Sequence, residues 1–564
     1  MLNDAVSYAP TIESEDLSLL AMALYKRSQV LLILKEYDLA LRDATLAGIK
    51  GAFPETELYS LYQHQAKCQE VSKCPFEAQK CYNRALSALD KSYLDASKKE
   101  LQRINIQEAL NLLGNRIETK NTKAKKDELE IMKKHPKYPT LSRTVSVQYS
   151  QERGRYVSAA DDIKIGDVLG VEEPITFSLK QEHLKSRCLN CFMSVCAGLP
   201  CHTCSQVVFC GLACRREATT TFHRYECQNL HLLKPGPNYL ALRAITKKPV
   251  KYFLEKRLSC FTNYDDSGGT ELEGSKVYKS LEMRNLFNLT TKKADLEKKM
   301  EFYMIAAYLL KILQQMGYFG TEKENESTLT EEEVYIGMLL SHFLAVIECN
   351  SHLICQLSKE HFNIRTLPDI LKKNFQPEEV GFGINTTLAF FNHSCNPNTI
   401  KIQKGNKTYL MATENLKKGE EIFDNYGYIF YSMDKISRNE EMGFQCKCEP
   451  CSQDWPKVYE MEILNPLKPL FQYRKLSDKI SLAENTSPHA AAGNLERGRA
   501  ANVLMQKMSS ELGLAHFSRV ISLSADYKRT LDKIIVPPHR FFFNNYMIFF
   551  YCYWIKYGNR DVTE

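Results

Sequence analysis

Apolar residues recur every three or four positions along the first part of the chain, which predicts amphipathic helices. This helical period runs through residues 16–91, and its members include Leu20, Leu24, Leu31, Leu34, Tyr37, Ala40, Leu41 and Ala47. From residue 145 the pattern becomes β-like, with short strands separated by turns at 153–155 and 165–167. Helical periods dominate residues 228–378. They return from 454 to about 533, broken by a polar loop at 485–494.

Small residues repeat within the N-terminal helical part. Ala40 and Ala47 are followed at the same interval by Ala78 and Ala85. The string LYKRSQVLLILKEYDLALRDATLAG resembles one tetratricopeptide (TPR) repeat, and PFEAQKCYNRALSAL resembles the end of a looser second copy. Their offset of 38 residues exceeds the usual value of about 34, so an insertion is needed. A plain antiparallel helical hairpin is the alternative, and either module of stacked helices offers a groove to a peptide.

Length and charge set broad limits on the protein. A chain of 564 residues predicts several domains, and its net charge of +7 is small for that length. Part of the charge comes from a lysine-rich run at 115–137, which we interpret as a solvated linker; a basic strip facing an acidic partner is the alternative. We therefore expect no direct nucleic-acid partner.

Neither end of the chain predicts membrane insertion. The first residues lack a basic segment followed by an apolar one, so we predict no signal peptide. The aromatic tail has an unbroken apolar run of ten residues at 546–555, whereas a membrane span needs about 20. We expect this tail to form a buried helix or strand without membrane contact.

The nineteen cysteines lie mostly in tight groups. Four close pairs in residues 188–227 supply eight ligands: Cys188, Cys191, Cys201, Cys204, Cys210, Cys214, His223 and Cys227. Further on, Cys446, Cys448 and Cys451 need a fourth ligand to complete a tetrahedral zinc site, and the nearest candidate upstream is Cys395. These spacings suit metal sites better than a disulfide framework, which indicates three zinc ions and a reducing nucleocytoplasmic setting.

Three segments near the third cysteine group carry a family resemblance. NHSCNPN at 392–398 is followed by GEEI at 419–422 with Tyr426, and then by CKCEPC at 446–451. In this order and spacing they resemble the SET domain and post-SET tail of the SET-and-MYND protein lysine methyltransferases, closest to the branch with an N-terminal TPR region. A loop with a structural zinc and no chemistry is the alternative interpretation.

The resemblance implies an α+β multidomain chain. A β-rich SET fold with a pseudoknot would be split by a MYND zinc finger and a helical insert, and flanked by N- and C-terminal all-α TPR-like domains. The expected boundaries are 15–135 for the N-terminal helices and basic linker, 140–187 for the first SET half, 188–227 for the MYND finger, 228–378 for the helical insert, 379–429 for the SET core, 430–455 for the post-SET segment and 456–564 for the C-terminal helices.

The MYND resemblance also implies how the finger's ligands are shared. One zinc would be held by Cys188, Cys191, Cys210 and Cys214, and the other by Cys201, Cys204, His223 and Cys227. Sites with four protein ligands are closed, so they stabilise the module and leave no position for a reacting water. The finger would then either bind proline-rich peptides or serve the fold alone.

Site residues are carried over from the family by position. Tyr426 matches the catalytic tyrosine that orients the acceptor amine and the methyl group. The residues that would hold S-adenosylmethionine are Arg153, Gly154, Arg155, Asn285, Asn350, Asn392, His393, Tyr426 and Phe444. Gly154 lets the backbone approach a ligand because no side chain stands in the way. Asn350 as a helix cap or buried amide, and Tyr426 as a core tyrosine, are the alternatives.

The function that the resemblance implies is S-adenosylmethionine-dependent methylation of protein lysines. A protein carrying the target lysine would be the substrate, peptides would bind the MYND and TPR surfaces, and we expect a monomer in nucleus and cytoplasm. The other class is a scaffold or corepressor with little activity, supported by Tyr156 and His352, where relatives often have glycine and an aromatic residue, and by the FDN that precedes Tyr426.

Overall fold

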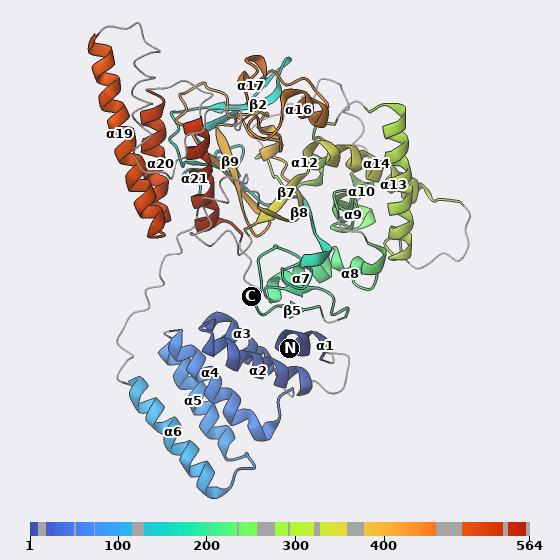
Figure 1. Cartoon of the computed structure of the whole chain (residues 1–564). Helices are drawn as coiled ribbons and strands as arrows, with labels where there is room; N and C mark the ends of the chain where they lie inside the picture. The colour runs from blue at the N-terminus through green and yellow to red at the C-terminus, as the bar shows by residue number, and fades with distance from the viewer. Residues whose placement is uncertain are drawn as a thin grey trace. The chain divides into compact units, whose positions relative to one another are not determined.

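A computed structural model of the chain describes most of its residues, and these form two compact units. One unit contains the N-terminal helices and most of the predicted zinc finger; the other contains the predicted SET core, the helical insert and the C-terminal helices (Figure 1). Lysines 120–126 of the predicted basic linker lie outside the described residues. The described ranges are 1–9, 18–49, 52–72, 74–114, 129–201, 203–233, 236–256, 277–291, 294–320, 328–357, 377–457, 488–533 and 540–559.

The N-terminal part of the first unit is all-helical, as the period of apolar residues predicts. Neighbouring helices pack in sequence, and alanines at Ala40, Ala47, Ala78 and Ala85 are fully buried where they meet. The repeat of buried alanines therefore marks two successive helix pairs; that they are TPR repeats stays a prediction. The helices are α1 Leu2–Tyr8, α2 Ser18–Ile33, α3 Tyr37–Ala47, α4 Leu58–Val71, α5 Pro75–Leu89 and α6 Ala96–Gly114, with the 3-10 turn η1 Glu55–Glu57.

The finger part of the first unit has short regular elements only. Strands β5 Leu199–Pro200 and β6 Val208–Phe209 pair antiparallel, and they are followed by α7 Leu212–Thr220 and α8 His223–Glu226.

Buried arginines join the N-terminal helices to this finger. Asp43 on α3 is fully buried and pairs with Arg27 of α2 at 2.6 Å and with Arg42 at 2.7 Å. The same guanidinium groups donate to finger carbonyls, Arg27 to Gly198 at 3.0 Å and Arg42 to Cys210 at 3.0 Å. The helical module and the finger are thus one folded body, which the sequence pattern does not predict.

Three antiparallel sheets form the centre of the second unit. A two-stranded sheet joins β1 Val145–Ser150 to β2 Gly154–Ala159. A second has the order β3-β10-β9, and a third the order β4-β8-β7. Their strands are β3 Val168–Glu172, β4 Thr176–Leu179, β7 His352–Gln356, β8 Glu378–Ile384, β9 Thr399–Lys404 and β10 Lys407–Ala412.

The core under these sheets is apolar and contiguous. Val157 of β2, Leu169 of β3 and Leu410 of β10 pack against Phe391 and Ile422, all of them at most 2% exposed. Residues 391 and 422 flank the two predicted site segments, so the core fixes the backbone on which the site is built.

The insert is helical, with one strand inside the range predicted for it. Helix α14 begins with a capping box between Thr330 and Glu333, and α13 is capped by Asp295. Strand β7 follows α14 directly and pairs with β8. The helices of this region are α9 Tyr239–Thr246, α10 Val250–Glu255, α12 Met283–Phe287, α13 Leu296–Gln315 and α14 Glu331–Asn350, with the 3-10 turn η3 Leu230–Leu232. Two further 3-10 turns lie outside it, η2 Gln181–His183 before the insert and η6 Leu388–Phe390 after it.

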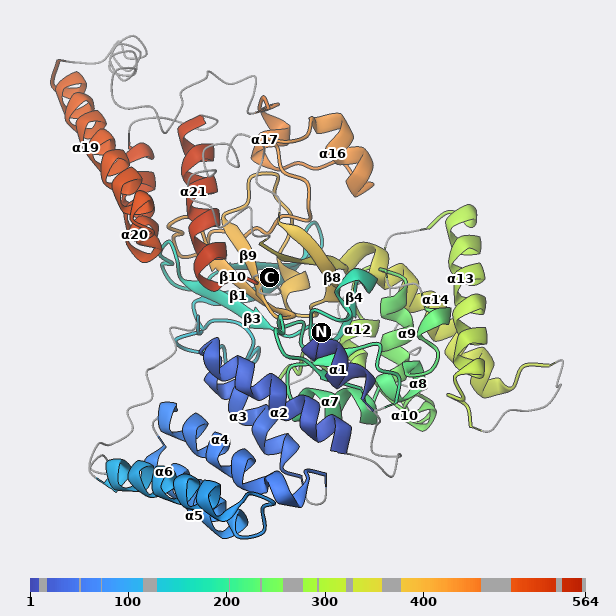
Figure 2. The same ribbon diagram turned by 60° about the horizontal axis from the view of Figure 1, so that its bottom comes forward.

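Short helices α16 Lys435–Met442 and α17 Glu449–Ser452 precede three longer ones, α19 Pro488–Gly513, α20 Phe517–Leu531 and α21 Arg540–Tyr557. Helices α19, α20 and α21 lie side by side in both ribbon views (Figures 1 and 2). The aromatic tail is the buried helix α21. Helix α19 begins at Pro488, so a loop over 488–494 was wrong; proline at the first helical position and the alanines after it favour a helix there.

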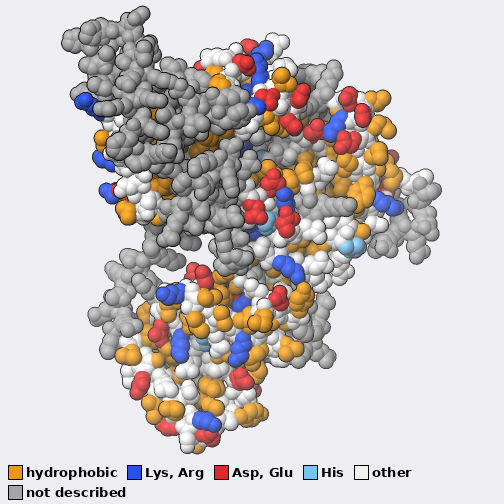
Figure 3. Space-filling view, in the orientation of Figure 1, with side chains coloured by type: hydrophobic (Ala, Val, Ile, Leu, Met, Phe, Trp, Pro, Cys, Tyr) orange, Lys and Arg blue, Asp and Glu red, His pale blue; other side chains and the backbone are white. Residues whose placement is uncertain are grey.

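Helix α21 closes onto the core through its aromatic side chains. Between it, α20 and the end of the predicted SET core lies a cavity of about 60 Å³, with Tyr431, Phe543, Tyr546 and Lys528 in its wall. Within the part of the chain that the structure describes, α21 included, a search finds no helix both long and apolar enough to span a bilayer. On the face shown in Figure 3, basic and acidic side chains are interspersed over the N-terminal helices.

Candidate functional site

Three groups of four metal-ligating side chains converge in the structure. In each group the ligand atoms all lie within 4.8 Å of one another. Zinc–sulfur bonds of about 2.3 Å in a tetrahedron place the sulfurs about 3.8 Å apart. The Sγ atoms of Cys210 and Cys214 are 3.5 Å apart, and those of Cys395 and Cys451 are 3.6 Å apart. The donor sets and their spacing therefore fit tetrahedral zinc.

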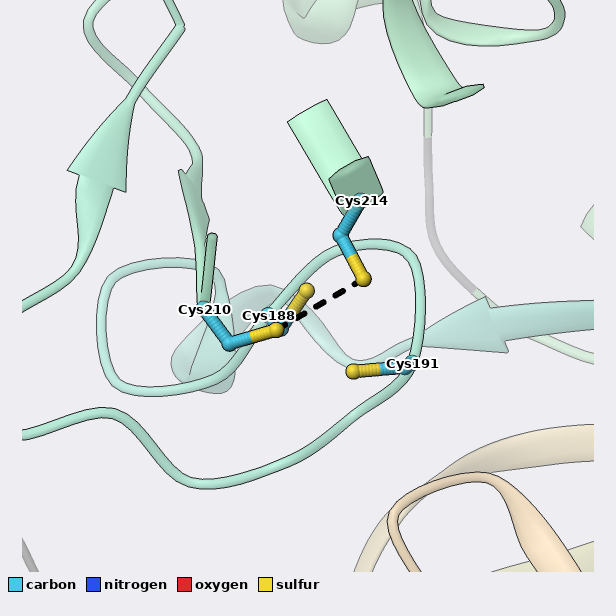
Figure 4. A group of neighbouring side chains, drawn as sticks. All are labelled: Cys188, Cys191, Cys210 and Cys214. Atoms are coloured by element: carbon cyan, nitrogen blue, oxygen red, sulfur yellow. Dashed lines mark hydrogen bonds between the residues drawn. The ribbon is translucent and has the colours of Figure 1, made fainter. Parts of the chain in front are cut away.

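The first group consists of Cys188, Cys191, Cys210 and Cys214, whose side chains point toward one another (Figure 4). Cys188 lies on a bridge to the strand that ends just before Cys210, and Cys214 follows in the first turn of α7. Strand β6 and the start of α7 thus hold the cysteines of this group in position.

The second group consists of Cys201, Cys204, His223 and Cys227. The His223 Nε2 atom is 3.7 Å from the Cys204 Sγ, and its Nδ1 atom is 3.8 Å from the buried carboxylate of Glu226. The distance from Nδ1 exceeds that of a hydrogen bond, so the Glu226 carboxylate faces the ring without fixing its orientation. Both ligand sets are the ones that the MYND resemblance implies.

The third group joins Cys395 to Cys446, Cys448 and Cys451. It ties the NHSC segment to residues about fifty positions later, on either side of the turn into α17. The Arg438 guanidinium on α16 lies 3.4 Å from the Cys451 Sγ, so a positive charge faces the cluster. The fourth ligand that the cysteine spacing required is supplied from upstream, as predicted.

Beside this cluster, two separate segments run parallel and interlock. The Asp424 N–H donates to the Asn392 carbonyl at 2.8 Å, and the Ser394 N–H donates to the Asp424 carbonyl at 2.9 Å. The Tyr426 N–H donates to Nδ1 of His393 at 3.1 Å. Burial lowers the pKa of His393 to about 4, so its ring is neutral at physiological pH and Nδ1 accepts this bond. The NHSC segment and the Tyr426 segment thus pair side by side, as the resemblance implies, and we call this paired region the knot.

The Tyr426 side chain lies over this knot. Its hydroxyl donates to the Phe391 carbonyl at 3.2 Å, and the residue is 45% exposed. Burial of the hydroxyl end, together with the nearby Asp424 carboxylate, raises the pKa of Tyr426 above its ordinary value. The hydroxyl is therefore protonated at neutral pH and acts as a hydrogen-bonding group.

The first predicted motif meets the knot at Glu421. The Arg153 guanidinium pairs with the Glu421 carboxylate at 3.0 Å, and the Asn392 amide donates to the same carboxylate at 3.1 Å. Gly154 has φ +65°, and a side chain added there would meet no atom within 4 Å. The turn thus favours glycine for its backbone angle, and the space beside it is open.

Three further predicted residues lie around the segment that follows α12. Arg155 donates to the Asn288 carbonyl at 3.1 Å, and the Asn350 amide donates to the carbonyls of Thr290 and Val346 at 2.8 Å each. Asn350 thus acts as a cap at the end of α14, the alternative left open by the sequence. Asn285 donates to the Lys279 carbonyl at 2.7 Å, away from the knot.

Phe444 precedes the third cysteine group. It follows Gly443, which ends α16 in the left-handed conformation, and its side chain is 43% exposed. An exposed aromatic ring at this place is free to cover a planar ligand.

Sequence reasoning missed two carboxylates as site residues. Glu421 stands inside the GEEI segment but was not assigned, although it binds both Arg153 and Asn392. Glu172 ends β3 and binds backbone groups more than two hundred residues away. The GEEI motif could have identified Glu421 as a site residue, whereas no sequence motif points to Glu172.

A β-rich core with two paired segments, joined to a four-cysteine group and interrupted by a finger with two four-ligand groups, defines a SET-type protein with side chains suited to zinc. Comparison with protein families matches residues 154–427 to the SET domain. The chain therefore contains a SET domain. Both ligand groups of the finger lie within the matched range, and the third group joins Cys395 inside it to three cysteines beyond its end.

Curated proteins with similar sequences include SMYD lysine methyltransferases, at modest identity. The chain is 22% identical over 338 residues to the N-lysine methyltransferase SMYD2-A of Danio rerio, covering 60% of this chain and 66% of that protein. It is 22% identical over 325 residues to the histone-lysine N-methyltransferase ASHR1 of Arabidopsis thaliana, covering 57% of each. It is 22% identical over 386 residues to the protein-lysine N-methyltransferase SMYD4 of Danio rerio, covering 56% of this chain and 50% of that protein. The match thus spans less than two thirds of each of these relatives.

Proposed function

We propose that the protein is an S-adenosylmethionine-dependent protein-lysine N-methyltransferase. The observation that carries this proposal is the parallel pairing of residues 392–394 with 424–426, which brings Asn392, His393 and Tyr426 to one place. The names of the similar proteins, which are lysine methyltransferases, support the same activity.

The residues around the knot suit S-adenosylmethionine, which supplies the transferable methyl group when bound. The backbone at Gly154 is open, the exposed Phe444 ring offers a stacking face, and the Asn392 amide lies beside Arg153 and Glu421. Arg153 and Asn392 are both held by Glu421, so the two walls of the site are fixed relative to each other.

Tyr426 would orient the acceptor amine. Its hydroxyl proton is committed to the Phe391 carbonyl, while its oxygen keeps lone pairs that accept a hydrogen bond from an amine. The raised pKa of Tyr426 excludes it as the base, so the amine must arrive neutral. Removal of water by the bound substrate would favour the neutral amine, and alignment of the reactants alone can supply effective molarities of about 10⁵ M.

Cofactor titration and one substitution test the proposal. Zinc-replete protein should bind S-adenosylmethionine in isothermal titration, and it should transfer labelled methyl groups to proteins of a cell extract. Tyr426→Phe should bind the cofactor but lose about 10²-fold in transfer rate, the size expected for one positioned hydrogen-bonding group at a reacting centre. Tyr428→Phe, two residues away, is the matched control and should keep the wild-type rate. Absence of cofactor binding by the wild type would sink the proposal.

The second candidate is a scaffold with a SET fold and little activity. The Asn350 amide is committed to two backbone carbonyls, and the buried Nε2 of His352 has no hydrogen-bond partner in the described residues. Neither side chain is thus placed to donate a hydrogen bond to a cofactor. Cofactor titration separates the two candidates, because the scaffold predicts no binding.

We further propose that the acceptor is a protein and that peptides bind the finger and the N-terminal helices, in nucleus and cytoplasm. The closed zinc sites support a binding or structural role for the finger. A monomer is expected, and light scattering of the purified chain checks it.

A further inference from the structure

We propose that Glu172 is a positioning residue for methyl transfer, acting through the backbone that leads to Tyr426. This inference rests on the proposed function and adds to it a residue outside the family's site motifs.

Glu172 is a charged side chain in a fully enclosed place. It is 1% exposed at the end of β3. Its carboxylate accepts the Thr387 N–H at 3.0 and 3.1 Å and the Leu388 N–H at 2.9 Å. Its backbone carbonyl accepts from the Asn385 amide at 3.2 Å. A buried acid that binds successive backbone N–H groups fixes the start of the turn to which they belong.

That turn leads directly to the proposed site. Thr387 and Leu388 begin η6, and Phe391 closes it by donating its N–H to the Leu388 carbonyl at 3.2 Å. The Phe391 carbonyl is the acceptor for the Tyr426 hydroxyl. Asn392 follows and binds Glu421. Three residues, 389–391, thus separate the Leu388 N–H that Glu172 holds from Asn392, where the knot begins.

The carboxylate is chemically specific for this task. In its ionised form, above its pKa of about 7, the carboxylate has two oxygens without a hydrogen, and they accept both N–H groups at once. The Thr386 hydroxyl, 3.3 Å from Glu172, is 2.8 Å from the Ser280 carbonyl, to which it donates. Glutamine of the same size would present an NH₂ group to backbone donors, so one buried donor would lose its acceptor and the turn would shift.

The next residue provides a matched control. Glu173 has a half-exposed side chain and pairs with Lys407 at 3.0 Å on the surface of the β3–β10 ladder. Glu173→Gln removes one carboxylate from the same strand end without touching the turn.

The experiment compares the wild type, Glu172→Gln and Glu173→Gln as full-length, zinc-replete chains at about pH 8, where the Glu172 carboxylate is ionised. Titration with S-adenosylmethionine gives the number of binding sites and the affinity. Single-turnover transfer of tritiated methyl to extract proteins, with enzyme in excess over cofactor, gives the rate for bound cofactor. Glu172→Gln should keep one site per chain while its single-turnover rate falls at least tenfold, and Glu173→Gln should match the wild type.

A merely structural role would give a different result. Partial unfolding of Glu172→Gln would lower the number of binding sites and leave the rate per bound cofactor unchanged, and this outcome would overturn the inference. A wild-type rate in Glu172→Gln would overturn it as well. In a Tyr426→Phe background, Glu172→Gln should add less than twofold, because both changes act through the same contact; independent, multiplying losses count against the inference.

A wild type that neither binds the cofactor nor transfers methyl groups would contradict the proposed function itself. An active wild type with an unaffected Glu172→Gln contradicts only the positioning role.

Discussion

Glu421 shows how one side chain can serve two walls of a site. Its carboxylate accepts from Arg153, at the turn before β2, and from Asn392, at the end of η6. These residues are far apart in the chain and would otherwise move independently. The pair of bonds makes the Gly154 turn and the knot a single surface, which is a requirement for binding a ligand across both.

Glu172 should also give the protein a characteristic dependence of stability on pH. Burial raises the pKa of Glu172 to about 7, although the bonds from Thr387 and Leu388 act in the opposite direction; the titratable group facing it is the Tyr278 hydroxyl. The folded state therefore keeps a proton that the unfolded state releases near pH 4.5. Stability should fall as pH rises through this window, by about 2 kcal/mol between pH 5.5 and 8.

Urea unfolding of zinc-replete protein between about pH 5.5 and 8 checks whether the free energy of unfolding falls as pH rises. Glu172→Gln should lack this contribution, so the difference in unfolding free energy between wild type and variant should shift in favour of the variant as pH rises. Glu173→Gln should follow the wild type. A constant difference at all pH values would contradict the raised pKa.

For individual residues, the sequence could predict those whose partners lie nearby in the chain. The predicted zinc ligands lie in pairs a few residues apart. Cys395 was predicted because the three cysteines at 446–451 need a fourth ligand to complete a tetrahedral site. Glu172 could not be found this way, because its partners Thr387 and Leu388 lie 215 and 216 residues away and offer backbone groups that leave no mark in the sequence.

At the scale of elements, the junction between α2, α3 and the zinc finger is the least expected feature. Asp43 is fully buried between Arg27 and Arg42, and both arginines reach carbonyls of the finger. The N-terminal helices therefore cover part of the finger's backbone. A peptide that binds the finger must use another part of its surface.

Removal of Asp43 should destabilise this junction strongly. Asp43→Ala leaves two arginines without their carboxylate, at a cost of about 3–5 kcal/mol. Asp38→Ala, on the exposed side of the same helix, should change the unfolding free energy by less than about 0.5 kcal/mol. Urea unfolding followed by the helical circular dichroism signal measures both; equal effects would show that the buried pair contributes nothing special.

Period and turn residues predicted most helices and the strands around Gly154, because amphipathic faces and tight turns are local properties. They did not separate β7 from the helical insert, since His352–Gln356 follows α14 directly and gains its strand partner from β8. The tail at 540–557 was left between helix and strand, because an aromatic run that is buried on all sides has no period to read.

At the scale of the whole molecule, metal content is the most direct test. The purified chain should carry three zinc ions, one for each ligand group. Cys395→Ser should carry two and lose S-adenosylmethionine binding, because the third group pins the knot to the post-SET segment. Cys74→Ser, outside the three groups, should keep three ions and wild-type affinity. Elemental analysis with cofactor titration gives both numbers, and full affinity with two ions would refute the pinning.

The last described residues should hold the C-terminal helices to the SET sheets. The Asn559 amide donates to the carbonyls of Gly405 and Cys355 at 2.8 and 3.0 Å, and its Oδ1 accepts the Gly405 N–H. Asn559→Ala would leave these buried groups unpaired and cost about 2–3 kcal/mol. Lys556→Ala, one turn earlier, should cost less than about 1 kcal/mol in the same unfolding measurement.

The union of Arg42 with the finger has a consequence for how the protein is made. The two partners, Arg42 and Ala197, are 155 residues apart, with the first SET strands between them. Ribosomes add about 5–20 residues per second, so the finger is synthesised roughly ten to thirty seconds after the N-terminal helices. During that interval the arginines and apolar faces of the helices are exposed to chaperones. The helices can dock only when the finger has folded, and the finger folds only when zinc is available.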